Sequence, residues 1–150
     1  MNRKLSDLLC SLGRAAVGGV LLYAGFVKAA GPSAEFAAAL AAYKLFPAAL
    51  ITPLSIGLPY IEMWVGLFVL TGFYTRQSAA LAAALFIMFL TTLAAAHFRG
   101  IDLASCGCFG ADALSPRTTI LMDSVLLVLS LAVYRLSKYL PPWSLDRALQ

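Results

Sequence analysis

The sequence contains a Cys-Gly-Cys motif, formed by Cys106 and Cys108, in the stretch ASCGCFG at residues 104–110. Two thiols separated by one glycine can form a tight disulfide, because glycine permits the backbone angles that so small a ring needs. A disulfide that closes so short a loop stabilises a fold little, and a tight one is readily reduced. The motif therefore favours thiol–disulfide exchange over a purely structural disulfide.

Metal binding is the other chemistry open to this pair. Two thiolates can bind a soft ion such as Cu(I) or Zn, with His97 as a third ligand. A closed structural zinc site needs four ligands at a characteristic spacing, and the sequence offers neither. Redox exchange needs only the pair, an accessible thiolate and nearby positive charge, which Arg99 and Arg117 can provide on either side of the motif. We therefore place redox chemistry ahead of metal binding.

The rest of the chain has the composition of an integral membrane protein. Of its 150 residues, 61% are hydrophobic and 12% are charged, and the mean hydropathy is +0.87. A soluble domain carries about 25% charged residues. The net charge of +4 could indicate nucleic-acid binding, but the basic residues form no dense or aromatic-interleaved patch. They lie between apolar runs, as topology signals do.

Four apolar segments, each close to the ~20 residues that a helix needs to cross hydrocarbon, predict an all-α fold. We expect a polytopic membrane four-helix bundle that forms a single membrane domain over residues 1–150. The second span starts near Pro53 and kinks at Pro59, or starts at Pro59 itself. The four expected spans cover approximately residues 8–30, 53–73, 77–98 and 118–136.

The first apolar segment has a second interpretation. Only thirteen residues separate Arg14 from Lys28, so the segment also resembles the core of a signal peptide, with a weak cleavage site at residues 27–29. We favour a membrane helix that continues past both residues, with Arg14 and Lys28 extending to the two membrane interfaces.

A shorter helix is expected over residues 33–46, in the first outer loop. Phe36, Leu40 and Tyr43 recur there at the spacing of one helical face. The helix is too short to span the membrane, so it lies in the interface or folds over the bundle.

The distribution of lysine and arginine predicts the orientation. Seven of these residues lie on the side of the two termini and four on the other side (Arg3, Lys4, Arg14, Arg76, Arg135, Lys138 and Arg147 against Lys28, Lys44, Arg99 and Arg117). This bias places both termini in the cytoplasm, and Cys106 and Cys108 on the periplasmic side of a bacterial inner membrane, where disulfides persist. Cys10 lies at the opposite face, too far away to pair with either. We expect it in an interfacial turn.

Ionisable residues cluster at the outer end of the predicted bundle. Glu62 and Asp123 interrupt apolar segments, where a charge is costly and indicates function. From their helix starts, Asp123 lies roughly 8 Å and Glu62 roughly 5 to 14 Å below the outer surface. Lys28 and His97 end two segments on the same side. These groups either form a buried network that fixes helix packing, such as a Lys28–Glu62 pair, or take part in the chemistry. We favour function for Glu62 and leave both options open for Asp123.

Three stretches resemble the MauE/DoxX family of redox-associated membrane proteins: RGIDLASCGCFG after the third segment, LPYIE in the second, and LLYAGFVKAAGPSAEFAAALAAYKLFP across the first outer loop. The resemblance covers roughly residues 13–136. It implies a four-helix membrane bundle whose cysteine motif faces the periplasm beside thioredoxin-like proteins. MauE-type members are linked to maturation of the disulfide-rich methylamine dehydrogenase, and DoxX-type relatives to sulfur-compound oxidation coupled to quinones. The motif match carries over to Cys106, Cys108, Glu62 and Lys28.

We therefore expect a membrane thiol–disulfide oxidoreductase. A thiolate of a periplasmic thioredoxin-like partner or substrate attacks the Cys106–Cys108 disulfide, and a quinone reoxidises the resulting dithiol. Glu62 or Asp123 would move protons, and Lys28 or Arg99 would favour the thiolate or a charged intermediate. His97 and Arg99 are the candidates for contact with the quinone.

Three alternatives remain. Electrons could flow outward, to reduce a periplasmic thioredoxin. The protein could bind or transport a soft metal or a small sulfur compound through the same cysteines. It could also be an accessory subunit of a redox maturation complex. Small residues such as Gly18 and Gly19 permit close helix contact, including contact in a homo-oligomer.

Overall fold

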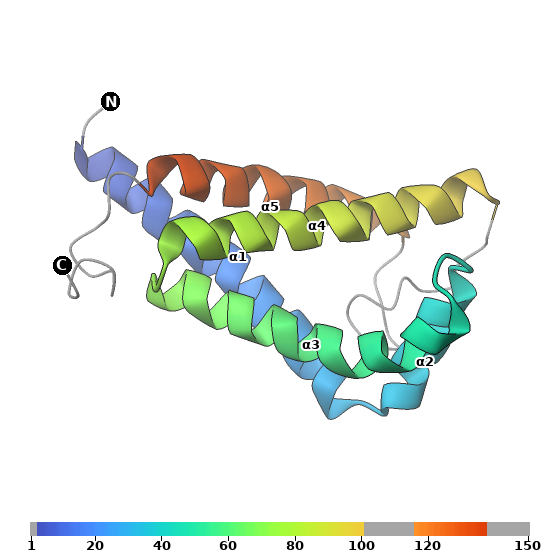
Figure 1. Ribbon diagram of the computed structural model, residues 1–150. Coiled ribbons are helices and arrows are strands. Elements are labelled where there is room, and N and C mark those ends of the chain that lie inside the picture. The colour runs from blue at the N-terminus through green and yellow to red at the C-terminus, as the bar shows by residue number, and fades with distance from the viewer. Residues whose placement is uncertain (1–2, 101–115, 138–150) are drawn as a thin grey trace.

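The computed structural model describes residues 3–100 and 116–137, and these form five α-helices (Figure 1). Cys106 and Cys108 lie outside the described residues. The helices are α1 (Arg3–Ala30), α2 (Ser33–Ala42), α3 (Ala48–Thr71), α4 (Thr75–Phe98) and α5 (Pro116–Leu136). Four of them contain a stretch long and apolar enough to cross a membrane, namely Asp7–Ala30, Ala48–Thr71, Thr75–Phe98 and Arg117–Leu136. The predicted all-α polytopic membrane bundle is confirmed.

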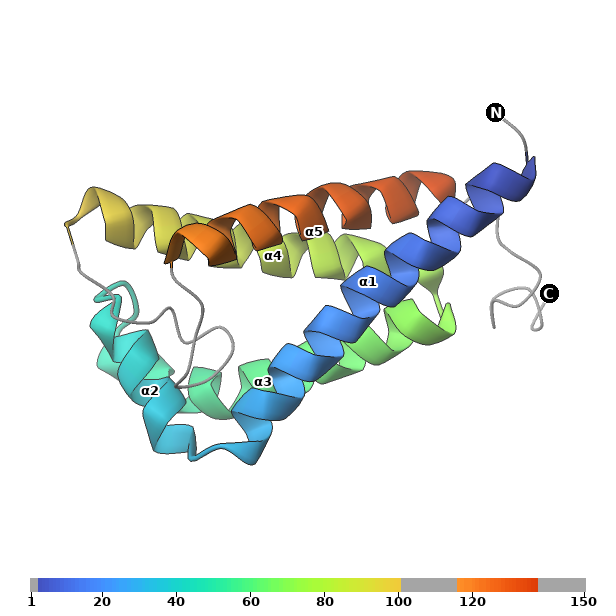
Figure 2. The ribbon, with the colours of Figure 1, turned by 180° about the vertical axis from the view of Figure 1, so that it is seen from behind.

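The four long helices form two pairs, α1 with α3 and α4 with α5. Both views show the pairs packed together near the chain's N-terminus and diverging toward the end where α2 lies (Figures 1 and 2). At that end α1 and α4 finish and α3 and α5 begin. We call it the α2 end of the bundle. Helix α4 ends at Phe98 and helix α5 begins at Pro116 on this same side, so the segment that carries the cysteine motif is attached at the α2 end.

The middle of the bundle is apolar. One cluster of buried side chains draws on all four long helices: Val17, Leu21, Val65, Val69, Ala82, Phe86 and Leu126. The outward faces carry large exposed apolar side chains, including Phe26, Trp64 and Leu121. A chain with apolar side chains both inside and outside suits a lipid surrounding, where the backbone hydrogen bonds must be satisfied within the helices.

Glycines allow α1 and α3 to approach closely. A Cβ atom on Gly18 would lie 2.7 Å from the carbonyl oxygen of Gly66, and one on Gly25 would lie 2.6 Å from that of Pro59. The two contacts are seven residues apart on each helix, so they fix a single antiparallel register. Gly18 thus makes a contact between two helices of the same chain, whereas a Cβ on Gly19 would meet nothing within 4 Å. Small residues at the contact bring two helix backbones together in a membrane bundle.

Helix α3 begins earlier than the sequence predicted. Its first residue is Ala48, preceded by Pro47 in an extended conformation (φ −58°, ψ 144°), and Pro53 and Pro59 lie inside the helix. The expected start at Pro53 or Pro59 was wrong. Each internal proline removes one backbone donor, but membrane helices tolerate such a loss when their neighbours pack against the site.

Cys10 lies within α1 and not in an interfacial turn, which corrects that expectation. Helix α1 begins at Arg3, among the polar residues that precede the apolar segment. Cys10 is seven residues further along and therefore lies inside the helix. The side chain is fully buried against Ala79 and Val133, and the thiol is free.

Replacement of Gly66 by alanine tests the close α1–α3 contact. The added Cβ would lie 2.7 Å from the backbone nitrogen of Leu22, so we expect Gly66→Ala to lower the free energy of unfolding by about 1–3 kcal/mol. Gly19→Ala is the matched control in open space and should leave stability unchanged or slightly higher. Thermal unfolding in detergent measures both. A Gly66→Ala variant as stable as Gly19→Ala would contradict the contact.

Candidate functional site

Lys28 and Glu62 form a buried ion pair. The Nζ atom of Lys28 lies 2.6 Å from each carboxylate oxygen of Glu62, and the two side chains are 2% and 0% exposed. These are two of the residues that the sequence singled out, one from α1 and one from α3. Charged residues inside a membrane bundle are rare, and pairing of this kind is how they are accommodated.

The antiparallel register explains how the two side chains meet. With Gly25 opposite Pro59, Lys28 lies about level with Ile56, roughly 9 Å along the helix axis from Glu62. Side chains on a helix lean toward its N-terminus. On α1 that direction leads into the bundle, and on α3 it leads toward the α2 end, so the two long side chains lean toward each other.

Glu62 lies deeper than the sequence predicted. It is fourteen residues beyond Ala48, roughly 21 Å along α3 and just past the middle of the helix. The expected depth of roughly 5 to 14 Å was wrong because α3 starts at Ala48 and not at Pro53 or Pro59. The ion pair therefore lies in the interior of the bundle, and Lys28 reaches it from near the end of α1.

Arg14 and Lys28 both turn inward, which corrects the expectation that they extend to the membrane interfaces. Arg14 is buried and donates hydrogen bonds from Nε to the carbonyl oxygen of Val69 (3.0 Å) and from Nη2 to that of Leu70 (2.9 Å). These carbonyls belong to the last turn of α3, which ends at Gly72 with a positive φ of 69°. A cation there stabilises carbonyls that have no partner within the helix.

The role of Arg14 was missed by sequence reasoning, although a signal was present. Arg14 lies one turn before Val17 and fourteen residues before Lys28. Since fourteen residues are nearly four helical turns, both cations share the face that carries the buried Val17 and Leu21. A cation on the buried face of an apolar helix indicates an acceptor inside the bundle.

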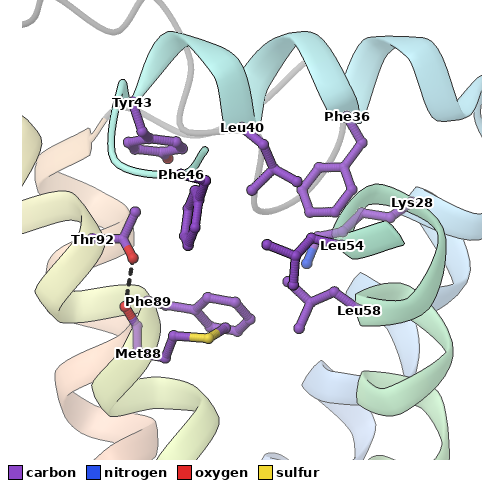
Figure 3. A pocket seen from close by; sticks show the side chains of 10 residues that line it. All are labelled: Lys28, Phe36, Leu40, Tyr43, Phe46, Leu54, Leu58, Met88, Phe89 and Thr92. Carbon is purple, nitrogen blue, oxygen red and sulfur yellow. Dashed lines mark hydrogen bonds between the residues drawn. The ribbon is translucent and has the colours of Figure 1, made fainter. Parts of the chain in front are cut away.

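A small cavity of about 40 Å³ lies beside Lys28, between α1, α2, α3 and α4 (Figure 3). Nζ of Lys28 lies 5.4 Å from the ring centre of Phe36 and 5.2 Å from that of Phe89, within the range of cation–π contact. Ten residues line the cavity, all but two of them apolar or aromatic: Lys28, Phe36, Leu40, Tyr43, Phe46, Leu54, Leu58, Met88, Phe89 and Thr92.

The position of α2 follows from the same cavity. Phe36, Leu40 and Tyr43, which the sequence placed on one helical face, all line it, and Leu40 and Tyr43 are buried. Of the two options for this helix, the structure shows that it folds over the bundle and covers the space between α3 and α4 (Figure 3).

The remaining predicted residues lie outside the lining of this cavity. Asp123 is buried on the inward face of α5, which also carries Thr119 and Leu126. His97 and Arg99 are exposed at the end of α4, where Arg99 donates a hydrogen bond to the carbonyl oxygen of Lys44 (3.0 Å). Their contact with a quinone stays a prediction.

The described residues offer no metal centre of their own. Within residues 3–100 and 116–137, no three His, Cys, Asp or Glu side chains are grouped so that they could hold a metal ion. His97 as a third ligand to the cysteines stays a prediction, because Cys106 and Cys108 lie outside those ranges.

Removal of one partner of the ion pair should destabilise the protein more than removal of both. Lys28→Met leaves the Glu62 carboxyl group without its partner inside the bundle, so we expect a loss of about 3–5 kcal/mol in the free energy of unfolding. Lys28→Met combined with Glu62→Leu should return to within about 1 kcal/mol of the wild type. Chemical denaturation in detergent measures both variants. Equal stability of the single variant and the wild type would show that the two charges are not buried together.

Comparison with known proteins gives the family. The family described as methylamine utilisation protein MauE matches residues 6–136. Methylamine utilization protein MauE from Methylophilus methylotrophus is 35% identical over 74 residues, which are 49% of this chain and 39% of that protein. The matched region therefore spans well under half of the relative's length. No solved structure matches the chain. Since the family match extends from the first turns of α1 to the end of α5, the chain belongs to the MauE family of membrane proteins.

Proposed function

We propose that this MauE-family protein is a membrane thiol–disulfide oxidoreductase that accepts electrons from periplasmic thiols through Cys106 and Cys108 and passes them to a quinone. The observation that carries the proposal is the buried Lys28–Glu62 pair beside an apolar cavity. The pair and the cavity lie between the middle of the bundle and the α2 end, where the segment with the cysteine motif is attached. An ionisable pair and an apolar binding space thus lie in the part of the bundle to which the segment with Cys106 and Cys108 is joined, and this supports the proposal.

The electron balance of the proposed reaction is simple. A thiolate of the partner attacks the Cys106–Cys108 disulfide, and the second partner thiol resolves the mixed disulfide, which leaves Cys106 and Cys108 reduced. Oxidation of this dithiol releases two electrons and two protons, and reduction of a quinone to a quinol consumes the same number. One turnover therefore converts two partner thiols and one quinone into a disulfide and a quinol.

The ion pair is better explained by this chemistry than by stability. A buried pair gains little over well-packed apolar side chains, because desolvation offsets most of the attraction. Glu62 and Lys28 instead provide a proton acceptor and a proton donor at 2.6 Å inside an apolar bundle. Asp123, buried on α5, is a further candidate for proton movement.

The proposed orientation places both termini in the cytoplasm and the α2 end at the periplasm of a bacterial inner membrane. Arg14 and Lys28 are buried, so neither is a loop charge. Without them, six lysine and arginine residues lie on the side of the termini and three on the other side, and the bias keeps its sign.

The proposed partner is a periplasmic thioredoxin-like protein in its reduced form, or a substrate protein whose thiols are to be joined in a disulfide. The name of the relative from Methylophilus methylotrophus refers to methylamine utilisation. We propose that this chain also supports methylamine utilisation, by forming disulfides during the maturation of an enzyme that acts on methylamine.

Thiol alkylation tests the proposed function. The protein, reduced and purified in detergent, is mixed with decylubiquinone, and free thiols are alkylated and identified by mass spectrometry over time. We expect loss of the Cys106 and Cys108 thiols together with quinol formation, while buried Cys10 keeps its thiol and serves as an internal reference. In the Cys106→Ser/Cys108→Ser variant no quinol should form. Thiols that stay reduced in the wild type, or quinol formation in the serine variant, would contradict the proposal.

A further inference from the structure

We infer that the cavity beside Lys28 binds the ring of a quinone, and that Lys28 donates a hydrogen bond to one of its carbonyl oxygens. This assignment rests on the proposed function for the choice of quinone as ligand. It differs from the sequence-based expectation in location, because it assigns the ring to the space between α2, α3 and α4 and not to His97 and Arg99 at the end of α4.

The lining of the cavity favours a flat, apolar ligand. Phe36 from α2 and Phe89 from α4 approach from two sides, and Leu54 and Leu58 from α3 close a third (Figure 3). Ligand sites of this kind combine an apolar wall with a few polar groups that fix orientation. Lys28 is the one charged side chain among the described lining residues, so a ligand needs an apolar body with a hydrogen-bond acceptor at its edge.

The charge of the site favours a neutral acceptor over an anion. The Glu62 carboxylate already balances the Lys28 ammonium at 2.6 Å, so an anionic sulfur compound would bring a negative charge that no further cation among the lining residues compensates. An ammonium has three N–H donors, and two point to the oxygens of Glu62. Among the described residues no acceptor takes the third, which leaves it for a carbonyl oxygen.

The two phenylalanine rings fix where such a ligand lies. Nζ of Lys28 is 5.4 Å from the centre of one ring and 5.2 Å from that of the other. A quinone whose carbonyl oxygen accepts a hydrogen bond from Nζ therefore has its ring against Phe36 and Phe89, where aromatic rings stack favourably. The cavity of about 40 Å³ is smaller than a quinone ring, so the proposal requires Met88 to shift when the ring binds. Methionine adapts to such changes readily.

The same geometry gives Lys28 a part in the reduction. If the two electrons of the Cys106/Cys108 dithiol reduce the ring to a quinol, each of its two oxygens must gain a proton, and Lys28, hydrogen-bonded to one of them, would deliver one of these protons. Glu62 would in turn pass a proton to Lys28, since its carboxylate oxygens accept hydrogen bonds from Nζ.

The test measures binding apart from thiol chemistry. In the Cys106→Ser/Cys108→Ser protein, binding of decylubiquinone is measured by equilibrium dialysis of detergent micelles. Leu54→Trp, which fills the cavity, should weaken binding at least tenfold. Ile56→Trp is the matched control, because Ile56 lies on the exposed face of α3 two residues away, and it should leave binding unchanged. Equal binding in all three proteins, or no binding in the parent, would overturn the cavity assignment.

A second comparison tests the hydrogen bond from Lys28 and does not depend on the folding of the tryptophan variant. The parent should bind decylubiquinone at least tenfold more tightly than decylbenzene, which has no carbonyl oxygen. In the Lys28→Met/Glu62→Leu variant this preference should disappear. A preference that persists there would overturn the role of Lys28. Because the cysteines are absent throughout, a failure of quinone binding is distinct from a failure of thiol oxidation in the wild type.

Discussion

The ion pair between Lys28 and Glu62 is the interaction around which the α2 end of this bundle is built. Pairing lowers the cost of placing two opposite charges inside an apolar bundle. Lys28 and Glu62 are offset along α1 and α3, and they meet because both side chains lean toward each other. The glycine contacts of Gly18 and Gly25 hold the two helices at the required distance. Helix α2 then places the ring of Phe36 5.4 Å from Nζ of Lys28. Backbone packing, side-chain direction and burial together allow the Lys28–Glu62 contact to form.

The two ends of the bundle differ in the kind of contact that they contain. At the end opposite α2, Arg14 binds the last carbonyls of α3, and the middle is filled by apolar side chains such as Val17, Leu21 and Phe86. These parts account for a stable fold. Toward the α2 end the helix pairs diverge, and an aromatic cavity adjoins the ion pair (Figures 1 and 3). The proposed chemistry would use this end of the bundle, where the segment with the cysteine motif is attached.

The sequence was sufficient for the parts of the fold that depend on local composition. Apolar runs of membrane length predicted four spans, and the spacing of Phe36, Leu40 and Tyr43 predicted the inward face of α2. The sequence left open whether Lys28 and Glu62 form a buried pair or take part in the chemistry. It shows a cation in one span and a carboxylate in another, but not which helices pack together. The start of α3 was wrong because Pro53 and Pro59 usually end a helix in water but not in a packed membrane bundle. Arg14 was misplaced because the signal for an inward side chain, its position on the helix face of Val17 and Leu21, is decisive only once that face is known to be buried. The cavity needs α2, α3 and α4 together, so no single stretch encodes it.

The most direct test of the central claim is the rate of quinone-dependent oxidation of Cys106 and Cys108 in liposomes that contain the Lys28→Met/Glu62→Leu variant. If the pair serves the chemistry, this variant keeps its helical content and its cysteines but oxidises its thiols about a hundredfold more slowly than the wild type, in line with the loss of a positioned proton donor and acceptor. Oxidation at the wild-type rate would show that the ion pair only fixes helix packing, and would contradict a role for Lys28 and Glu62 in proton transfer.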